Sequence, residues 1–364
     1  MVLAFAVGYF LPLNVPQIMP RLSLPEFQTL PYPLLDVRAP IEFAQGHVPG
    51  ALNLPLFTDE ERARIGTAYK QVSQEKAVHL GLEFFGPKMS EMVKQAKKLA
   101  PGKEVRLHCW RGGMRSGAVL WLLELAGFKV HLLDHGYKDY RRAVLASFDQ
   151  PRQWRVLGGL TGSGKTDVLH ALAAVPYHYP VLDLEGLAHH KGSAFGAIGQ
   201  PAQPTQEQFE NNLATALAQL PTDAPIWVED ESRQIGRLTI PAGLFTQMRA
   251  APRYVLEVPR AARVTKLAAE YGAESPAELA AAIERLQKRL GGQATKQALA
   301  AVEAGNFPLM VELVLDYYDK TYAHSLAPRP EAPPHTLIQA STCDAAANAA
   351  LLAALATSSP RNRL

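Results

Sequence analysis

The chain has 364 residues, of which 48% are hydrophobic and 20% are charged, which is the composition of a globular protein with room for two domains. A net charge of +3 is too small to indicate a nucleic-acid partner by itself. Only two cysteines are present, Cys109 and Cys343, which argues against a disulfide framework. A free thiol suits a reducing compartment, so we expect a cytoplasmic protein.

The first 23 residues (1–23) form an apolar leader that the sequence leaves unassigned. Residues 2–13 are apolar, but Gly8 and Pro12 interrupt them and no lysine or arginine precedes them. A signal peptide needs a basic start, and a membrane span needs about 20 apolar residues. We therefore expect neither here, and we expect no membrane partner.

Residues 24–148 alternate short β patterns with helical patterns. Buried strands are expected at 34–37, 104–108 and 130–133. Ser116 is a typical N-cap residue and Gly127 a typical helix stop, which predicts a helix over 116–125. Strands separated by helices predict a parallel α/β sheet.

The pattern restarts after a linker at 147–153, and a second domain is expected over 149–325. Its predicted strands are the apolar runs at 154–157, 181–183, 226–228 and 253–258. Thr205 with Gln208 predicts a capping box at the start of a helix. From about residue 260 the chain becomes helical, and residues 326–364 form a Pro/Ala-rich tail.

The first segment that carries chemistry is the loop His-Cys-Trp-Arg-Gly-Gly-Met-Arg-Ser at 108–116. A strand that ends at Cys109, before glycines and a helix, points backbone N–H groups at the sulfur. Arg111 and Arg115 add positive charge, so the pKa of the thiol is expected below its free value of about 8.5. A thiolate in such a cradle attacks species bearing a phosphate or sulfate-like group, whereas the alternative is a buried structural cysteine. The expected anion-binding loop comprises Trp110, Arg111, Gly112, Gly113, Met114 and Arg115.

Further residues around this loop stand at rhodanese spacing. They are Asp36-Val37-Arg38, Glu42-Phe43, the run Gly-His-Val-Pro-Gly-Ala-Leu-Asn at 46–53 and Gly-Tyr-Lys-Asp-Tyr-Arg at 136–141. Residues 24–148 therefore resemble a rhodanese domain. The resemblance implies that Asp36 and Arg38 support the loop and take no part in the chemistry.

The loop departs from sulfur-transferring rhodaneses in its length. Five residues, and not four, separate Cys109 from Arg115. His-Cys-x5-Arg-Ser is also the spelling of cysteine-dependent phosphatases, and the wider loop suits a tetrahedral phosphate or a selenium atom. A phosphatase would need an aspartic general acid, for which Asp134 and Asp139 are the nearby candidates.

The second segment matches the complete P-loop pattern, with a strand before it and a helix after it. Its expected phosphate-binding residues are Gly159, Thr161, Gly162, Ser163, Gly164, Lys165 and Thr166. Lys165 would neutralise phosphate charge and Thr166 could hold Mg²⁺. The acid on the Mg²⁺ side should end a buried strand, so Glu229 and Asp230 are the candidates. No other metal site is expected, because the chain lacks ligand spacing for zinc.

The two loops together resemble the family of bacterial tRNA 2-selenouridine synthases. Shorter family-like segments are His-Lys-Gly-Ser-Ala-Phe-Gly at 190–196, Gln-Pro-Thr-Gln at 203–206, Glu-Ser-Arg at 231–233 and Tyr-Tyr-Asp at 317–319. The resemblance covers residues 24–322. It implies a rhodanese-like parallel-sheet domain followed by a P-loop NTPase-like α/β domain with a helical extension.

The resemblance also implies an activity, the replacement of sulfur by selenium at wobble 2-thiouridine of certain tRNAs. Selenophosphate and geranyl diphosphate would be co-substrates, S-geranyl-2-thiouridine an intermediate, and Cys109 the carrier of selenium as a selanylcysteine. No tightly bound cofactor is implied, and a selenophosphate-supplying enzyme is a candidate partner. The P-loop would hold geranyl diphosphate or a nucleotide, and Mg²⁺ could assist.

Basic residues of the helical segment are the candidates for binding tRNA phosphates. Those singled out are Arg260, Arg263, Arg285 and Arg289. Scattered cations also occur on ordinary solvated helix faces, which is the alternative interpretation. Two rival functions remain open at this point: a cysteine-dependent phosphatase fused to a kinase-like P-loop domain, and a nucleotide-gated RNA-binding module.

Overall fold

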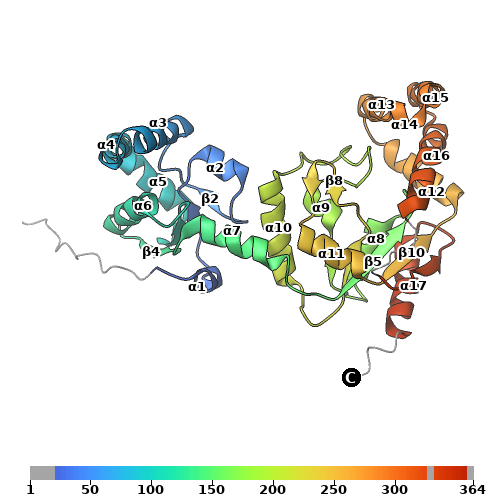
Figure 1. The fold of residues 1–364 in the computed structure, drawn as a ribbon, viewed down its shortest axis with the longest axis horizontal. Helices are drawn as coiled ribbons and strands as arrows, with labels where there is room; N and C mark the ends of the chain where they lie inside the picture. The colour runs from blue at the N-terminus through green and yellow to red at the C-terminus, as the bar shows by residue number, and fades with distance from the viewer. Residues whose placement is uncertain (1–20, 326–331, 359–364) are drawn as a thin grey trace, which may run out of the picture. The chain divides into compact units, whose positions relative to one another are not determined.

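The computed structural model describes residues 21–325 and 332–358. The chain divides into two compact units, Met1–Val144 and Leu145–Leu364, and each unit is built on its own parallel sheet (Figure 1). The predicted α/β class is confirmed, including the order of the two sheet domains. Among the described helices, none combines the length and the apolar character needed to cross a membrane.

The first unit has a four-stranded parallel sheet in the order β2-β1-β3-β4. The strands are β1 (Leu34–Asp36), β2 (Leu52–Asn53), β3 (Glu104–His108) and β4 (Lys129–Leu132). Leu35, Val105, Leu107 and Val130 are completely buried, as expected of parallel strands covered on both faces. Because β3 is a central strand, Cys109 follows at the middle of the carboxyl edge, where α/β sheets bind ligands.

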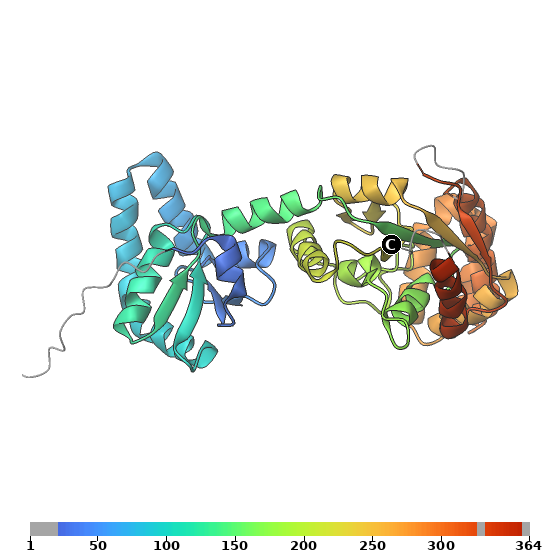
Figure 2. The ribbon, with the colours of Figure 1, turned by 90° about the horizontal axis from the view of Figure 1, so that it is seen from below.

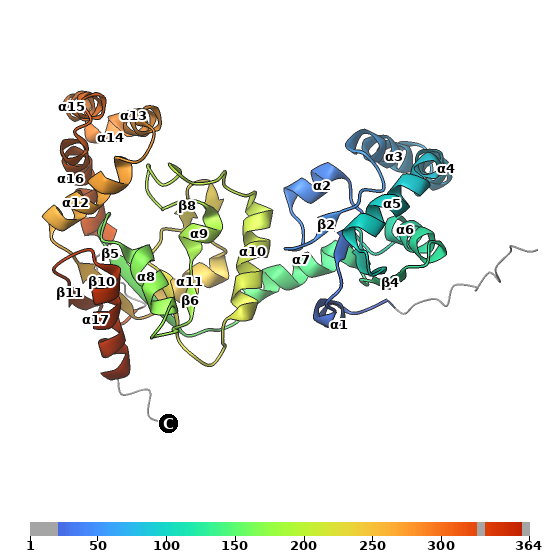
Figure 3. The same ribbon diagram turned by 180° about the vertical axis from the view of Figure 1, so that it is seen from behind.

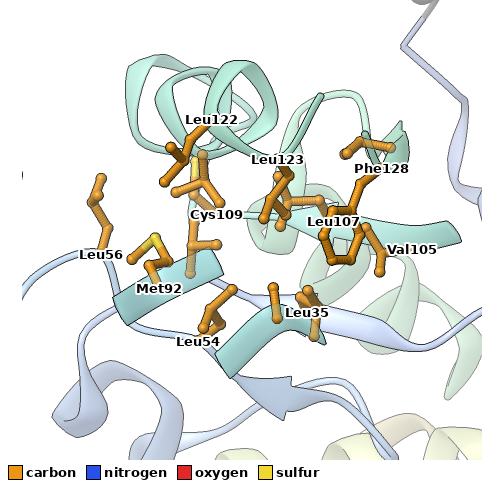
Figure 4. Packing of buried hydrophobic residues seen from close by; sticks show 14 of the residues in the cluster. Leu35, Leu54, Leu56, Met92, Val105, Leu107, Cys109, Leu122, Leu123 and Phe128 are labelled. Atoms are coloured by element: carbon orange, nitrogen blue, oxygen red, sulfur yellow. The ribbon is translucent and has the colours of Figure 1, made fainter. Parts of the chain in front are cut away.

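Helices cover both the faces and the edges of this sheet. They are α1 (Leu24–Thr29), α2 (Pro40–Gln45), α3 (Asp59–Gln71), α4 (Gln74–Phe85), α5 (Met89–Leu99), α6 (Met114–Leu125) and α7 (Gly136–Ser147). Figure 4 shows Leu122 and Leu123 of α6 and Met92 of α5 in the same apolar cluster as Cys109. The cysteine is therefore fixed from one side by close-packed hydrocarbon.

The predicted start of α6 is wrong by two residues. The helix begins at Met114 and Gly113 occupies the N-cap position, so Ser116 lies within the first turn and is not the cap. Gly113 can occupy the N-cap position because the glycine-rich loop directs the backbone into the helix, so no side-chain cap is needed. The Ser116 hydroxyl is thereby left to face the sulfur of Cys109.

The second unit has a five-stranded parallel sheet in the order β11-β10-β5-β7-β6. The strands are β5 (Trp154–Gly159), β6 (Val181–Leu182), β7 (Ile226–Glu229), β10 (Arg253–Glu257) and β11 (Thr336–Gln339). A short antiparallel hairpin, β8 (Gln234–Ile235) and β9 (Leu238–Thr239), stands apart from the sheet. Strand β5 is central, so the P-loop that follows it also lies at a carboxyl edge.

The helices of the second unit fall into two groups. Those around the sheet are α8 (Lys165–Ala173), α9 (Leu184–Ala188), α10 (Gln206–Gln219), α11 (Ala242–Ala250) and α17 (Ala345–Ser358). The helical extension consists of α12 (Arg260–Tyr271), α13 (Pro276–Arg285), α14 (Gln287–Leu290), α15 (Gly292–Glu303) and α16 (Phe307–Ser325). The extension has an apolar cluster of its own, which includes Leu279, Ile283 and Leu315.

The segment expected as a tail contains a strand that the sequence analysis missed. Strand β11 runs in parallel beside β10 (Figure 2). In this pairing Val255 lies opposite Leu337. Helix α17 then packs against α8, as seen from behind in Figure 3. Residues 336–358 therefore complete the sheet domain that carries the P-loop.

Two neighbouring residues of β11 test this assignment. The Ile338 side chain is 3% exposed within the core, whereas Leu337 is 49% exposed. We expect Ile338→Ala to reduce the free energy of unfolding of the second unit by about 2–5 kcal/mol, because a buried cavity is created. Leu337→Ala is the matched control and should cost less than about 1 kcal/mol. Urea unfolding followed by tryptophan fluorescence measures both, and equal effects would contradict the placement of β11.

Candidate functional site

Cys109 lies directly after β3, with 3% of its surface exposed. Its Sγ atom is 3.2 Å from the Ser116 hydroxyl oxygen, which is also 3.2 Å from the Gly113 carbonyl oxygen. The hydroxyl has one proton, and it can turn from the carbonyl to the sulfur when the thiol ionises.

The loop backbone is held open toward the sulfur by the first turn of α7. The Tyr137 N–H donates to the Cys109 carbonyl (2.9 Å), and the Lys138 N–H donates to the Trp110 carbonyl (2.9 Å). With these carbonyls turned away, backbone N–H groups farther along the loop remain for an anion.

Glycine is required at two points of this arrangement. Gly112 and Gly136 both have positive φ angles, +63° and +60°. A Cβ atom on Gly136 would lie 2.6 Å from the Gly112 nitrogen and would collide with the Cys109 carbonyl oxygen. The loop keeps its shape only because two backbones approach closely here.

The pKa of the Cys109 thiol is lowered. Burial acts to raise it, but the Ser116 hydroxyl, the backbone N–H groups of Arg111 and Ser116, and the charge of Arg115 together outweigh burial. Each of these groups stabilises the thiolate more than the thiol. The electrostatic arrangement is therefore that of a reactive cysteine.

The two loop arginines differ in their surroundings. Arg115 is partly buried and its Nη1 lies 2.6 Å from Glu42 Oε2, while Arg111 is exposed at the rim. Met114 is also exposed, and Trp110 is partly buried with its ring 5.7 Å from that of Tyr137. One guanidinium is thus fixed and the other is free to move toward a ligand.

A buried ion pair supports the loop from below, as the rhodanese resemblance implies. Arg38 makes a bidentate contact with Asp36, and both side chains are completely buried. The Arg38 guanidinium lies 3.7 Å from the centroid of the Tyr137 ring. Neither residue contacts the sulfur, so the pair positions the loop and does not react.

The candidate general acids are engaged elsewhere. Asp134 pairs with His135 (3.2 Å) and Arg21 (3.8 Å), and Asp139 pairs with Arg142. Within the described residues, Ser116 is the side chain that hydrogen-bonds the Cys109 sulfur, and no carboxyl group does so. Both aspartates are thus held in ion pairs, and neither hydrogen-bonds the sulfur.

The P-loop has the backbone that phosphate binding requires. Gly162 and Gly164 have φ angles of +81° and +77°, and Lys165 donates to the Gly159 carbonyl oxygen at 3.2 Å. The Ser163 hydroxyl is fully buried without a hydrogen-bond partner in the described part of the chain. A phosphate oxygen would supply the missing partner.

The acids beside the P-loop are not the ones predicted. Thr166 donates to Glu185 Oε2 at 2.7 Å, and Glu231 is buried in the same cavity. Burial, and then the charge of Glu185, raise the pKa of Glu231 to about 8. Glu185 follows the strand expected at 181–183, so its position after a buried strand was the signal that could have identified it.

Glu229 and Asp230, the predicted Mg²⁺-side acids, do not line this cavity. Glu229 is completely buried, and its carboxylate accepts the Leu184 N–H at 3.1 Å. Burial raises its pKa well above the ordinary value of 4.5. Asp230 pairs with Arg253 at 3.5 Å. Both predicted acids lie at the end of β7, whereas the chain reaches the cavity two residues after Glu229, at Glu231.

The cavity has a volume of about 300 Å³ and two kinds of wall. One side is the P-loop with Lys165 and Thr166, and Phe195, Ile198 and Leu267 form an apolar patch beside it. The rest of the lining is largely charged and includes Lys191, Lys266, Glu270 and Glu274. This pairing suits a ligand with a charged head and a hydrocarbon tail. Among the described residues there is no cluster of three or more His, Cys, Asp or Glu side chains able to hold a metal ion.

The four arginines proposed for tRNA binding are in different environments. Arg263 is 3% exposed, pairs with Asp319 at 2.8 Å and donates to the Thr161 carbonyl oxygen at 3.2 Å. It therefore fixes the P-loop and cannot reach a tRNA phosphate. Arg260 is paired with Asp316 and Asp319, while Arg285 and Arg289 are exposed on the helical extension.

Two family models match the chain. A rhodanese-like domain matches residues 24–143, and the tRNA 2-selenouridine synthase AAA domain matches residues 152–340. Three relatives described as tRNA 2-selenouridine synthase come from Marinobacter nauticus, Shewanella sediminis and Aeromonas salmonicida. They are 38%, 35% and 37% identical, over 81%, 85% and 82% of this chain and 88%, 92% and 88% of their own length.

The two cysteines give an internal comparison for the thiolate. The pKa of Cys109 is lowered, whereas burial raises that of Cys343. We expect iodoacetamide to alkylate Cys109 with a pH midpoint below the free value of about 8.5, and Cys343 only above it. Ser116→Ala should move the Cys109 midpoint upward. Peptide mapping across a pH series measures both, and equal midpoints for the two thiols would contradict a stabilised thiolate.

The raised pKa of Glu231 predicts a stability change with pH. The folded protein holds this proton more tightly than the unfolded chain, whose value is 4.5. The stabilisation is complete below pH 4.5 and is lost as the pH rises through about 8. Glu231→Gln should flatten the dependence between these limits, and the exposed Glu284→Gln should not. Thermal unfolding at several pH values checks this, and parallel curves for wild type and Glu231→Gln would disprove it.

Proposed function

The chain belongs to the tRNA 2-selenouridine synthase family and is an enzyme, and from that premise we propose that it replaces the sulfur of wobble 2-thiouridine with selenium from selenophosphate. One observation carries the proposal: the thiol of Cys109, with its lowered pKa, lies in an anion-binding loop on a chain that also has a P-loop cavity with an apolar wall. These two sites match two phosphorylated co-substrates of different shape.

The P-loop cavity is assigned to geranyl diphosphate. The N–H groups of the loop and Lys165 would hold the diphosphate, and Phe195, Ile198 and Leu267 would contact the hydrocarbon chain. The tRNA sulfur attacks C1 of the geranyl group, the C–O bond breaks, and diphosphate leaves with the electron pair. The product is S-geranyl-2-thiouridine, whose sulfur has become part of a leaving group.

Mg²⁺ fits the oxygen donors at the head of this cavity. The Thr166 hydroxyl and the Glu185 carboxylate are 2.7 Å apart beside the P-loop, and both are hard oxygen ligands. A bound Mg²⁺ would neutralise part of the diphosphate charge. The residues of the chain itself supply the phosphate cradle and the walls that exclude water.

Cys109 is assigned to selenophosphate. The loop N–H groups and Arg115 favour the thiolate and would hold the three phosphate oxygens, with Arg111 available at the rim. The thiolate can react at selenium, which gives the selanylcysteine that the family resemblance implies, or at phosphorus. An enzyme that makes selenophosphate must supply this substrate.

Binding of tRNA is assigned to the exposed cations of the helical extension. Arg285 and Arg289 are exposed there, together with Lys288 and Lys296. Contacts with phosphates would make the affinity fall steeply as salt increases. The rival phosphatase is less well supported, because the relatives are tRNA 2-selenouridine synthases and because Asp134 and Asp139 are paired with basic side chains.

Reconstitution with purified components tests the function. The full chain is incubated with tRNA containing wobble 2-thiouridine, geranyl diphosphate and selenophosphate, and the nucleosides are separated by chromatography with mass detection. We expect 2-selenouridine from the wild type, whereas Cys109→Ser should stop at S-geranyl-2-thiouridine. Absence of 2-selenouridine under these conditions would overturn the proposal.

The P-loop assignment has its own test. Lys165→Ala should lower the rate of geranyl transfer by roughly a hundredfold, because it removes the main charge that stabilises the leaving diphosphate. The exposed Lys320→Ala is the matched control and should leave the rate unchanged. Geranyl transfer that continues normally in Lys165→Ala would show that the P-loop serves another ligand.

A further inference from the structure

Building on the proposed selenium exchange, we propose that the Cys109 thiolate attacks the phosphorus atom of selenophosphate. The sulfur then carries a phosphoryl group, and selenium leaves as hydrogen selenide. On this mechanism Cys109 never holds selenium. The argument rests on electron balance and on the residues around the sulfur.

Attack at phosphorus balances without a further reagent. The S–P bond forms, the P–Se bond breaks, and the electron pair and the donor's proton leave with selenium as HSe⁻. Phosphorus and selenium keep their oxidation states throughout. Water then cleaves the S–P bond, which releases phosphate and restores the thiolate for the next cycle.

Attack at selenium does not balance in this way. Selenium in selenophosphate is already fully reduced, so forming an S–Se bond leaves the P–Se electron pair on phosphorus. The displaced group is then phosphite and not phosphate. A further thiol would also be needed to reduce the S–Se bond before selenium could enter the tRNA. The proposed reaction supplies no such thiol and does not produce phosphite.

The loop geometry favours a phosphoryl group on sulfur. The N–H groups of Arg111 and Ser116 face the Cys109 sulfur, and five residues separate this cysteine from Arg115. Arg115 is fixed by Glu42 at 2.6 Å, on the helix that follows β1. A phosphoryl group on sulfur has three oxygens that can accept from these donors, whereas a single selenium atom does not need as many.

Ser116 has a role in the second step. Its hydroxyl lies 3.2 Å from the sulfur, and it can donate to the thiolate that leaves when water cleaves the S–P bond.

The selenide leaving group does not need a general acid. Hydrogen selenide is a much stronger acid than an alcohol, so selenide leaves without being protonated. Asp134 and Asp139 are held in ion pairs with His135 and Arg142. Transfer of the phosphoryl group from selenophosphate therefore depends on neither aspartate.

The released HSe⁻ is the species that reacts with S-geranyl-2-thiouridine. It adds to C2 of the base, the C–S bond breaks, and geranylthiolate leaves. Selenium enters the tRNA in the oxidation state in which the donor held it. The rhodanese-like loop then serves to release selenide from its donor.

Rapid mixing of the full chain with selenophosphate tests the inference. The reaction is stopped with denaturant, intact mass and peptide mapping locate the adduct, and ³¹P NMR identifies the phosphorus product. We expect a phosphoryl group on Cys109 and phosphate in solution. Ser116→Ala should lengthen the lifetime of the adduct about tenfold, because the leaving thiolate loses one hydrogen bond. The exposed Ser90→Ala is the matched control, and Cys343→Ser keeps the second thiol out of the measurement.

The outcomes separate this inference from the proposed function. Selenium on Cys109 with phosphite in solution overturns the inference while 2-selenouridine is still formed. Formation of 2-selenouridine with no phosphoryl adduct, even in Ser116→Ala, also overturns it. A phosphoryl adduct without any 2-selenouridine in the complete assay keeps the chemistry at Cys109 and overturns the proposed function.

Discussion

The close approach of two backbones beneath Cys109 is the constraint on which the first unit depends. The Tyr137 N–H binds the Cys109 carbonyl, and Gly136 sits where any side chain would collide with that carbonyl. The loop is thereby forced to present N–H groups, and not carbonyls, to the sulfur. Burial alone would raise the pKa of the thiol, so the reactive thiolate exists because the backbone is oriented in this way.

In the second unit, the backbone of the P-loop is held in place by a side chain. Arg263 joins the Thr161 carbonyl of the P-loop to Asp319 on α16. Gly162 packs against Leu267, where a Cβ atom would lie 2.6 Å from the leucine side chain. The helical extension therefore sets the position of the phosphate cradle and also supplies Leu267 and Tyr271 to the apolar part of the cavity. The P-loop and the extension form one functional element.

The sequence was informative where chemistry is local. Both loops, their flanking strands and the support role of Asp36 and Arg38 follow from short motifs whose spacing fixes the backbone. It was less informative where contacts are distant in the chain. In the sequence, Arg263 cannot be distinguished from an ordinary exposed helix residue, because its partner Asp319 is far away along the chain. Glu231 was missed because it lies two residues beyond the end of its strand. Strand β11 has four residues, which are too few for an alternating hydrophobic pattern to reveal a strand.

The position of β11 has a consequence for how the protein is made. This edge strand is separated from its neighbour β10 by the whole helical extension. Domains fold as units during synthesis, beginning with the N-terminal one. The first unit can therefore fold while the second is still being made, whereas the sheet beneath the P-loop stays incomplete until β11 has been synthesised. A nascent chain can thus form its thiolate loop before it completes the domain that carries its P-loop.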